Sequence, residues 1–280
     1  MRRNTELFQF GNEFPLTKAL VESTRTTVKN GEYLRNVADD LEQLLASNEL
    51  SQLINSYVEK LISVPESDPP FMQQEHIVLC QDFGGALIAI GRTEVGNNVP
   101  LYSVTAEALL GAVSANGFTY RMHQMPTDWD QSVFNPEIKM QDAETKKCEQ
   151  GHSLLLSTTT LYDYASTGDI VIKIVGPNHS ALMWEFDRAT RKAVSVHAAT
   201  PDATIITYLM KFLAEHGNAR SVNAIRHMLK HQFHYIRWDA VKALGKIDGN
   251  ELKDVLKILL DDPHPHVRNA SLKTMTQLGM

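Results

Sequence analysis

The sequence predicts an α+β multidomain protein: N-terminal helices, then a β sandwich or barrel, then a C-terminal array of paired helices. Three observations support this order. Between residues 16 and 64, apolar side chains recur at helical spacing. From residue 73 onward, short runs rich in β-branched and aromatic residues replace that pattern. After residue 204 the spacing is helical again and the chain repeats itself. We expect domains at residues 1–72, 73–201 and 202–280.

The first region is predicted to form two or three helices. Leucine and valine residues mark one face of each helix, and the turn signals Asn30-Gly31 and Ser47-Asn48 separate them. The stretch SVPESDPPF, residues 63–71, then contains three prolines, which have no backbone donor and cannot continue a helix. We therefore expect a linker without regular structure at this point.

The middle region contains seven or more short apolar runs separated by turn residues, among them DIVIKIV and ALMWEFD. Such a series without intervening helices is typical of a sandwich or small barrel. ALMWEFD and KAVSVHA, joined by RATR, are predicted to form a hairpin that buries Trp184, Phe186, Val194 and Val196 on one face. Residues 105–113, TAEALLGAV, fit either a helix or a strand.

The C-terminal region is predicted to consist of stacked repeats. A shift of 31 positions places Arg268 on Arg237, and residues 255–260, VLKILL, on residues 224–229, AIRHML. One further shift brings residues 209–213 into the same register. A unit of two short amphipathic helices cannot bury its apolar faces alone and must stack on its neighbours.

An ion pair should join neighbouring repeats. The arginines recur one period apart, but Asp261-Asp262 of the later unit corresponds to Lys230-His231 of the earlier one. In a stacked array Arg237 should therefore reach forward to Asp261 or Asp262, and a carboxylate near the turn should hold both arginines. No obvious cap follows Gly279, so we expect the last helix to be the least stable part of the array.

The residues DDPHPHVRNASLKTM resemble a HEAT repeat, with Asp262-Pro263 ending its first helix and Val267-Arg268 opening its second. IRWDAVKALGKID is similar to the second helix and turn of the same family. The resemblance implies stacked helix pairs that bind other proteins, so a protein partner is expected. Related di-iron hydroxylases place a His-Glu pair where this chain has Trp238-Asp239 and Asn269-Ala270, so their activity is not expected here.

The segment GDIVIKIVGPNHSALMWEFDRATRKAV, residues 168–194, resembles the later strands of the cupin jelly roll. Metal-dependent cupins carry an H-x-H motif, which this region lacks. A cupin-like metal site would have to use His123, His152 and His197, with Glu185 as its carboxylate. The alternation in WEFD places Glu185 opposite the aromatic side chains, outside a barrel that buries them. A cupin-like jelly roll without metal ligands is therefore favoured.

Two further groups of candidate residues lie in the C-terminal region. His227 and His231 are four residues apart, which on one helix face would suit one Zn²⁺ or Fe²⁺. No carboxylate or cysteine stands at a matching position, which favours a solvent-facing polar surface instead. Tyr235, Arg237 and Trp238 are of the residue types enriched at binding hot spots, so they are candidate partner-binding residues. The alternative for this group is core packing against the β domain.

His264 and His266 are explained as turn residues that flank Pro265.

Composition excludes several classes of partner. The formal net charge of -6 supplies no general attraction for nucleic acid or anionic lipid, so neither is expected as a partner. No apolar run approaches the length of a membrane span. The first residues lack the apolar core of a signal peptide, and Cys80 and Cys148 are the only cysteines, which favours a cytoplasmic protein with free thiols.

The expected function is non-enzymatic binding, regulation or scaffolding through the HEAT-like repeats, without a cofactor. Nucleophile-elbow and phosphate-loop motifs are absent from the sequence. The alternative is a metal-dependent cupin-type enzyme, such as a small-molecule oxygenase, that holds Fe or Zn with non-standard ligands. The oligomeric state stays open.

Overall fold

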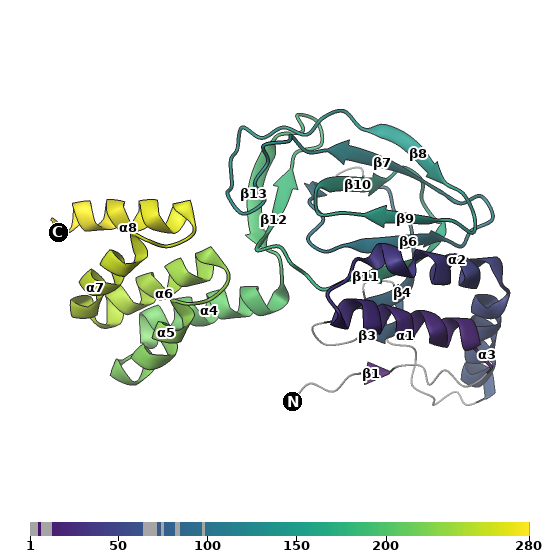
Figure 1. Cartoon of the computed structure of the whole chain (residues 1–280), viewed down its shortest axis with the longest axis horizontal. Coiled ribbons are helices and arrows are strands. Elements are labelled where there is room, and N and C mark those ends of the chain that lie inside the picture. The colour runs from purple at the N-terminus through teal and green to yellow at the C-terminus, as the bar shows by residue number, and fades with distance from the viewer. Residues whose placement is uncertain are drawn as a thin grey trace. The chain divides into compact units, whose positions relative to one another are not determined.

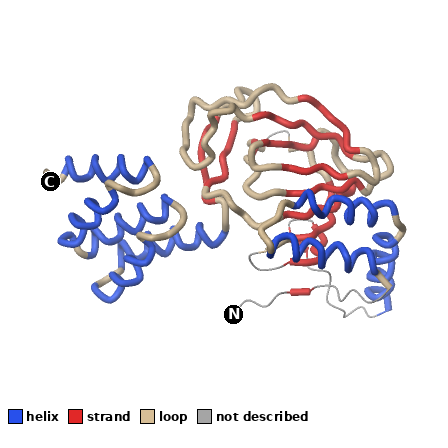
Figure 2. Tube along the Cα trace, viewed as in Figure 1, coloured by secondary structure: helices blue, strands red, loops and turns tan. Residues whose placement is uncertain are grey.

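The computed structural model describes residues 5–6, 13–63, 72–73, 76–81, 85–96 and 99–279. Helices come first, strands follow and helices end the chain, as the sequence predicts (Figures 1 and 2). The predicted linker at residues 63–71 lies outside the described residues, except for Ser63 at the end of a helix.

The chain divides into two compact units. The first comprises Met1–Trp129, Pro136–His179 and Trp184–Ser195, and the second comprises Asp130–Asn135, Ser180–Met183 and Val196–Met280. The N-terminal helices therefore share a unit with the strands, although the sequence predicts a separate domain at residues 1–72. The reason is that one face of the strands and the helices bury each other's apolar side chains in a common core.

Three α-helices and one short 3-10 helix form the N-terminal layer: α1 (Pro15–Lys29), η1 (Leu34–Val37), α2 (Ala38–Ala46) and α3 (Glu49–Ser63). The first residue of α3 caps α1, because the Glu49 carboxylate accepts the backbone N–H groups of Leu16 at 2.9 Å and Thr17 at 2.6 Å. These N–H groups have no acceptor inside α1 itself, so the carboxylate supplies one. Its negative charge also interacts favourably with the positive end of the helix dipole.

The strands form three antiparallel sheets. The largest has the order β1-β3-β4-β11-β6-β9, with β2 also paired to β3. Its strands are β1 (Thr5–Glu6), β2 (Met72–Gln73), β3 (His76–Gln81), β4 (Leu87–Arg92), β6 (Ala108–Ala112), β9 (Ser153–Leu156) and β11 (Ile170–Val175). The second sheet is β10 (Thr160–Tyr164), β7 (Phe118–Gln124) and β8 (Glu144–Cys148), and the third is β13 (Ala193–Ala198), β12 (Leu182–Phe186) and β5 (Leu101–Tyr102). Residues 105–113, which fit a helix or a strand, thus contain strand β6.

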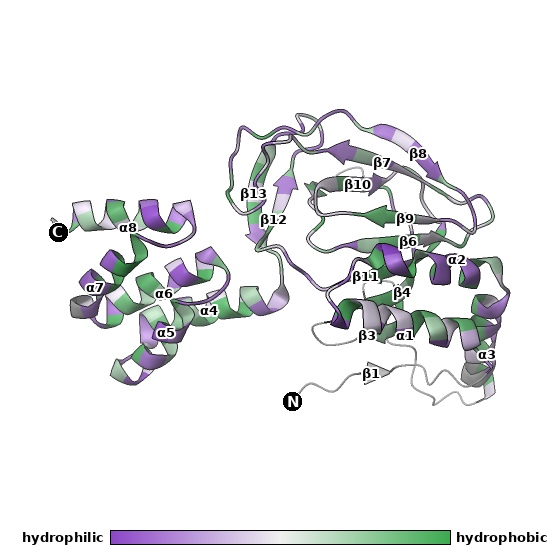
Figure 3. Ribbon diagram, in the orientation of Figure 1, coloured by the Kyte–Doolittle hydropathy of each residue, from purple (hydrophilic) through white to green (hydrophobic). Residues whose placement is uncertain are grey.

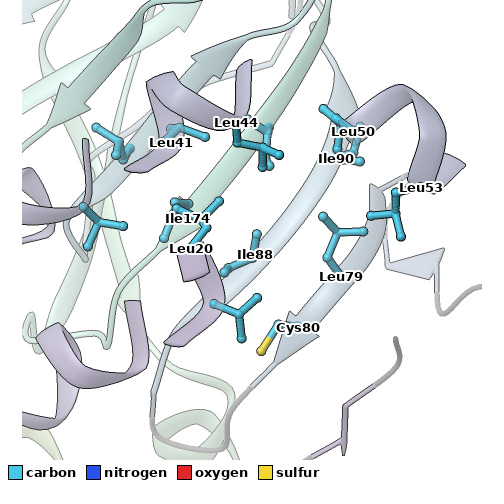
Figure 4. Close-up of a cluster of buried hydrophobic side chains, with 14 of the residues drawn as sticks. Leu20, Leu41, Leu44, Leu50, Leu53, Leu79, Cys80, Ile88, Ile90 and Ile174 are labelled. Atoms are coloured by element: carbon cyan, nitrogen blue, oxygen red, sulfur yellow. The ribbon is translucent and has the colours of Figure 1, made fainter. Parts of the chain in front are cut away.

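Alternate side chains on the largest sheet point to its two faces, and each face belongs to a different hydrophobic core. On β11, Ile172 and Ile174 pack with the leucines of the N-terminal helices. Figure 4 shows Ile174 in this cluster with Leu20, Leu41 and Leu44. Val171 and Val175 point to the opposite face and pack with side chains of the second sheet. The first unit is therefore a layer of helices on one side of a β sandwich, and the sandwich has its own interior.

The predicted β12-β13 hairpin forms, but its burial pattern is correct for one arm only. Trp184 and Phe186 are fully buried, whereas Val194 is 56% exposed. Backbone hydrogen bonds pair Asp187 with Lys192 and Ala181 with Ala199. Between these two pairs the chain advances six positions on the β12 arm and seven positions on the β13 arm. The extra residue in β13 shifts the alternation between the arms, which the period-two pattern cannot reveal.

The second unit contains α4 (Pro201–His216), η2 (Ala219–Ser221), α5 (Val222–Met228), α6 (His234–Ile247), α7 (Gly249–Leu259) and α8 (Pro265–Gln277). The helix pairs α5-α6 and α7-α8 are the two complete repeats, and α4 packs against α6. The 31-residue register is visible in the hydrogen bonds. Arg237 Nη1 donates to the carbonyls five and six residues before it, and Arg268 Nη1 does the same.

The predicted ion pair between the repeats is confirmed. Arg237 donates from Nε to Asp262 Oδ2 at 2.8 Å and from Nη2 to Asp262 Oδ1 at 2.6 Å. Both side chains are buried, with 9% and 2% exposure. The expectation that one carboxylate holds both arginines is wrong, because Arg268 donates to the backbone carbonyl of Asp262 and to that of Pro263.

Candidate functional site

His123 and His152 of the predicted cupin-like site do not come together within the first unit. His123 lies on β7, buried, whereas His152 has a 69% exposed side chain and lies 3.9 Å from Glu42. His197 is on β13, in the part of the chain that belongs to the second unit. Among the described residues, none of these histidines belongs to a group of three His, Cys, Asp or Glu side chains close enough to share a metal ion. Glu185 also accepts a 2.6 Å hydrogen bond from Ser195.

His123 instead lies beside a carboxylate that two arginines already hold. Asp163 on β10 accepts hydrogen bonds from Arg121 Nη2 and Arg188 Nη1, each at 2.6 Å. His123 Nε2 lies 3.5 Å from Asp163 Oδ1. Burial would raise the pKa of Asp163, but His123 and the two arginines lower it to about 2. The cluster is therefore an ion network around a buried carboxylate, with the two arginines partly exposed, and its residues do not fit an Fe or Zn centre.

The pair His227 and His231 is also separated. Helix α5 ends at Met228, so His231 lies beyond the helix and does not share a face with His227. His231 Nδ1 accepts the backbone N–H of Phe233 at 3.0 Å, and its ring contacts the Phe233 ring. The spacing of four implies a shared face only while the helix continues, and here the helix ends too early.

One histidine group that the sequence interpretation missed does have metal-like spacing. Single nitrogen atoms of His234, His264 and His266 lie within 4.8 Å of one another. The rings of His234 and His264 stack in parallel, 3.5 Å apart. The H-x-H spacing in DPHPH was the available signal, and the register shift of 31 places Phe233, the neighbour of His234, on His264.

This group is not a ready metal site. His264 Nδ1 accepts the backbone N–H of His266 at 3.2 Å and caps α8. A ring nitrogen that accepts leaves the other nitrogen protonated, and His264 Nε2 lies 3.0 Å from the Ser132 carbonyl. Neither nitrogen of His264 then has a lone pair for a metal. The stacked rings serve as packing at the junction of the two repeats.

The three predicted partner-binding residues are engaged within the array. Arg237 is 8% exposed and holds Asp262, so it joins repeats rather than presenting a guanidinium to a partner. Trp238 is partly buried against the core around Val241, and the Tyr235 ring stacks on Phe233. These residues lie on α6, and the next repeat covers part of them: residues of α7 and α8 pack with Trp238, and Asp262 binds Arg237.

A different surface of the array is exposed and apolar. Helix α4, largely green in Figure 3, exposes Ile205 by 50%, Tyr208 by 66%, Leu209 by 51% and Phe212 by 59%. These four residues have the spacing i, i+3, i+4, i+7 of one helix face. We call them the α4 face.

A groove between α5 and α7 is the second apolar feature of the array. It has a volume of about 600 Å³. Leu229, Val255 and Leu259 line it with apolar groups, Ile258 is 71% exposed there, and its polar lining comes from Asn223, Arg226, His227 and Lys230. Arg226 is paired with Glu251. The groove thus combines an apolar floor with a basic rim.

Residues 197–276 match the family model described as HEAT repeats. This match confirms the resemblance of the C-terminal region, where helix pairs stack with the observed register. No curated protein matches the chain. No helix among the described residues combines the length and apolar character of a membrane span.

Several solved structures are similar to part of the chain. A hydroquinone 1,2-dioxygenase from Sphingomonas sp. TTNP3 with 4-hydroxybenzoate bound is 15% identical, at a TM-score of 0.27, over 42% of this chain and 72% of that chain. A salicylate 1,2-dioxygenase from Pseudoaminobacter salicylatoxidans with gentisate is 10% identical, at a TM-score of 0.23, over 45% and 31%. An uncharacterised protein with a double-stranded β-helix domain from Klebsiella pneumoniae is 12% identical, at a TM-score of 0.24, over 42% and 84%.

Proposed function

We propose that the C-terminal array binds an amphipathic helix of a protein partner, and that the α4 face is the docking surface. The observation that carries this proposal is that α4 exposes large apolar residues at positions whose equivalents in the next repeat are buried. The positions 31 residues after Ile205, Leu209 and Phe212 are Ile236, Ala240 and Ala243, each with 0% exposure.

The repeat explains what is missing at α4. On α6, Ala240 and Ala243 pack with Val222 and Ile225 of α5, the first helix of the same repeat. Helix α4 corresponds to α6 in the register, but a β-strand, β13, precedes it where the first helix of its repeat would stand. The α4 face therefore has the position of a helix-binding surface without a helix from its own repeat.

The net charge of the array indicates which charge the polar face of the partner helix carries. Residues 202–280 contain 11 lysine and arginine residues and 8 aspartate and glutamate residues, a formal charge of +3, whereas the whole chain carries -6. Lys211 lies beside the α4 face, with Nζ 5.7 Å from the centre of the Tyr208 ring. An acidic helix with apolar residues at i, i+3, i+4 and i+7 fits such a surface.

A selection of displayed helical peptides on the full-length protein tests the proposal. The enriched peptides should be amphipathic and acidic, and Phe212→Asp should weaken their binding about tenfold or more, because it places a charge in an apolar contact. Ile258→Asp is the matched control: it makes the same kind of change on an exposed isoleucine in the groove between α5 and α7.

Each result decides the docking surface. Peptides that bind the Phe212→Asp variant and the unmodified protein equally would contradict the proposal. Loss of binding in Ile258→Asp alone would assign docking to the groove instead. Sedimentation of the unmodified protein is the third measurement: a dimer that Phe212→Asp dissociates would mean that a second copy, rather than a different partner, covers the α4 face.

A further inference from the structure

The groove between α5 and α7 has two unlike walls. The wall from α7 is apolar and consists of Val255, Ile258 and Leu259. The wall from α5 carries cationic side chains, among them Arg226 and Lys230. Ile258 is 71% exposed, so the α7 wall presents a large apolar side chain to solvent. A ligand with one apolar part and one anionic part would contact both walls.

The difference between the walls belongs to this groove rather than to the repeat. The shift of 31 positions relates α5 to α7, and the buried positions obey it: Ile225 corresponds to Leu256, each with 0% exposure. The groove-lining positions do not obey it, because His227 corresponds to Ile258 and Lys230 to Asp261. Stacking of the repeats therefore does not explain the basic wall.

The basic wall carries one positive charge that its neighbours do not neutralise. Arg226 donates from Nε and Nη2 to the two carboxylate oxygens of Glu251, so that pair has no net charge. Lys230 is exposed and forms no ion pair with a described acidic side chain. A ligand with a single negative charge would balance the charge of the groove.

A second donor lies next to this lysine. The backbone N–H of Lys230 donates to the His227 carbonyl at 3.3 Å, and this turn brings both side chains to the α5 wall. The His227 ring is exposed. An imidazole N–H and an ammonium group side by side can both donate to one carboxylate, which forms charge-assisted hydrogen bonds. This end of the α5 wall therefore fits an anionic oxygen group.

The dimensions of the groove suit a small molecule. Its volume of about 600 Å³ lies within the range of clefts that bind small organic ligands. Helix α5 has 7 residues, so the wall that it supplies is about 10 Å long. An aliphatic chain of similar length can lie against the α7 wall while its head group stays beside Lys230.

We propose that the groove between α5 and α7 binds a small aliphatic carboxylate. Its chain packs along Val255, Ile258 and Leu259, and its carboxylate accepts hydrogen bonds from Lys230 and His227. This site lies apart from the α4 face and does not depend on the docking of a partner helix there.

Titration calorimetry of the full-length protein separates the contribution of the charge from that of the chain. Decanoate, kept below its micelle-forming concentration, has both features. Acetate has the charge alone and should bind at least about tenfold more weakly, as should octanoate, which lacks two methylene groups. N-decanoyl-N-methylglucamine has the chain with an uncharged head group and should bind severalfold more weakly. Equal affinity of decanoate and this uncharged probe would overturn the proposal.

Variants of the two walls locate the site. Ile258→Asp should weaken decanoate binding about tenfold or more, because it places a negative charge on the apolar wall. Lys230→Glu should have a similar effect, whereas Lys230→Arg keeps the charge and should retain binding. Lys253→Glu is the matched control, since it reverses the charge of an exposed α7 lysine outside the groove. All three changed side chains are exposed, so the melting temperatures of the ligand-free variants should stay nearly the same.

Undiminished decanoate affinity in Ile258→Asp or in Lys230→Glu would refute the site, and so would the absence of decanoate binding up to about 10 mM. Phe212→Asp separates this site from the α4 face: it should leave decanoate binding unchanged, and a loss would place decanoate on the α4 face instead. The acidic helical peptides selected for the α4 face should not displace decanoate. Displacement would mean that the groove binds peptides, which would also contradict the proposal.

Discussion

At the scale of single residues, the contact between Arg237 and Asp262 is the most consequential one in the C-terminal array. Asp262→Ala would leave a buried guanidinium without its two charge-assisted bonds, so we expect a loss of about 3 kcal/mol of stability in the last repeat. Hydrogen exchange should show reduced protection across residues 252–278 and unchanged protection in the strands. Asp261→Ala is the control, because Asp261 is exposed.

Unchanged protection in the Asp262→Ala variant would contradict this role of the ion pair, as would uniform loss along the whole chain. The latter result would mean that the repeats and the sandwich unfold as one unit.

The stacked histidines predict a pH dependence at the same scale. Burial, and then the charges of His264, His266 and Arg237, lower the pKa of His234 from its ordinary 6.5 to about 4. Between these values the unfolded chain binds more protons than the folded one, so stability is complete above pH 6.5 and falls as the pH drops toward 4. The loss should be about 3 kcal/mol at most.

Chemical denaturation of His234→Phe and of the unmodified protein between pH 4 and 7 measures this effect. The variant keeps an aromatic ring against His264 but cannot titrate, so its stability should vary less over that interval. An equal slope in both proteins would show that other groups cause the dependence. Asp163 and Asp262 also have lowered pKa values, so their own losses begin at the acid end of the interval, but both proteins share them and they do not produce a difference between the two slopes.

At the scale of elements, the packing of α2 on β6 depends on a glycine. A Cβ at Gly111 would lie 2.7 Å from Ile172 Cγ2 and 2.8 Å from Leu45 Cδ1. Gly111→Ala should therefore force the helix and the sheet apart and cost about 1 to 3 kcal/mol, measured by denaturant titration. Gly249→Ala at the start of α7 is the control, because a Cβ there meets nothing within 4 Å.

A stable Gly111→Ala protein would mean that α2 can shift without loss of core contacts. The Gly249→Ala variant should be as stable as the unmodified protein or slightly more so, since alanine favours a helix more than glycine does.

At the scale of the whole molecule, each of the two compact units has its own hydrophobic cores, so we expect two unfolding transitions. Leu41 and Leu256 are both 0% exposed, but Leu41 lies in the core shared by helices and strands and Leu256 in the core of the repeats. Leu41→Ala and Leu256→Ala should each cost about 2 to 5 kcal/mol and each shift a different calorimetric transition. A single transition lowered by both variants would show that the units unfold together.

Local patterns in the sequence determined the order of helices and strands, the burial of Trp184 and Phe186, and the register of the C-terminal repeats. Helical and strand periodicities belong to short stretches of chain, so they are visible without a fold. The contact of Arg237 with Asp262 was predictable for the same reason, because a repeat fixes which residues meet when neighbouring units stack.

Only the tertiary structure decided which distant polar residues meet. Lys173 and His76 are 97 residues apart and carry no spacing signal, and their contact follows from the pairing of β11 with β4 and of β4 with β3. Likewise His123 meets Asp163 and its arginines instead of His152, because strand order sets the neighbours of a side chain. The exposure of the α4 face is also a tertiary property, since the same apolar spacing would be buried wherever a first helix covers it.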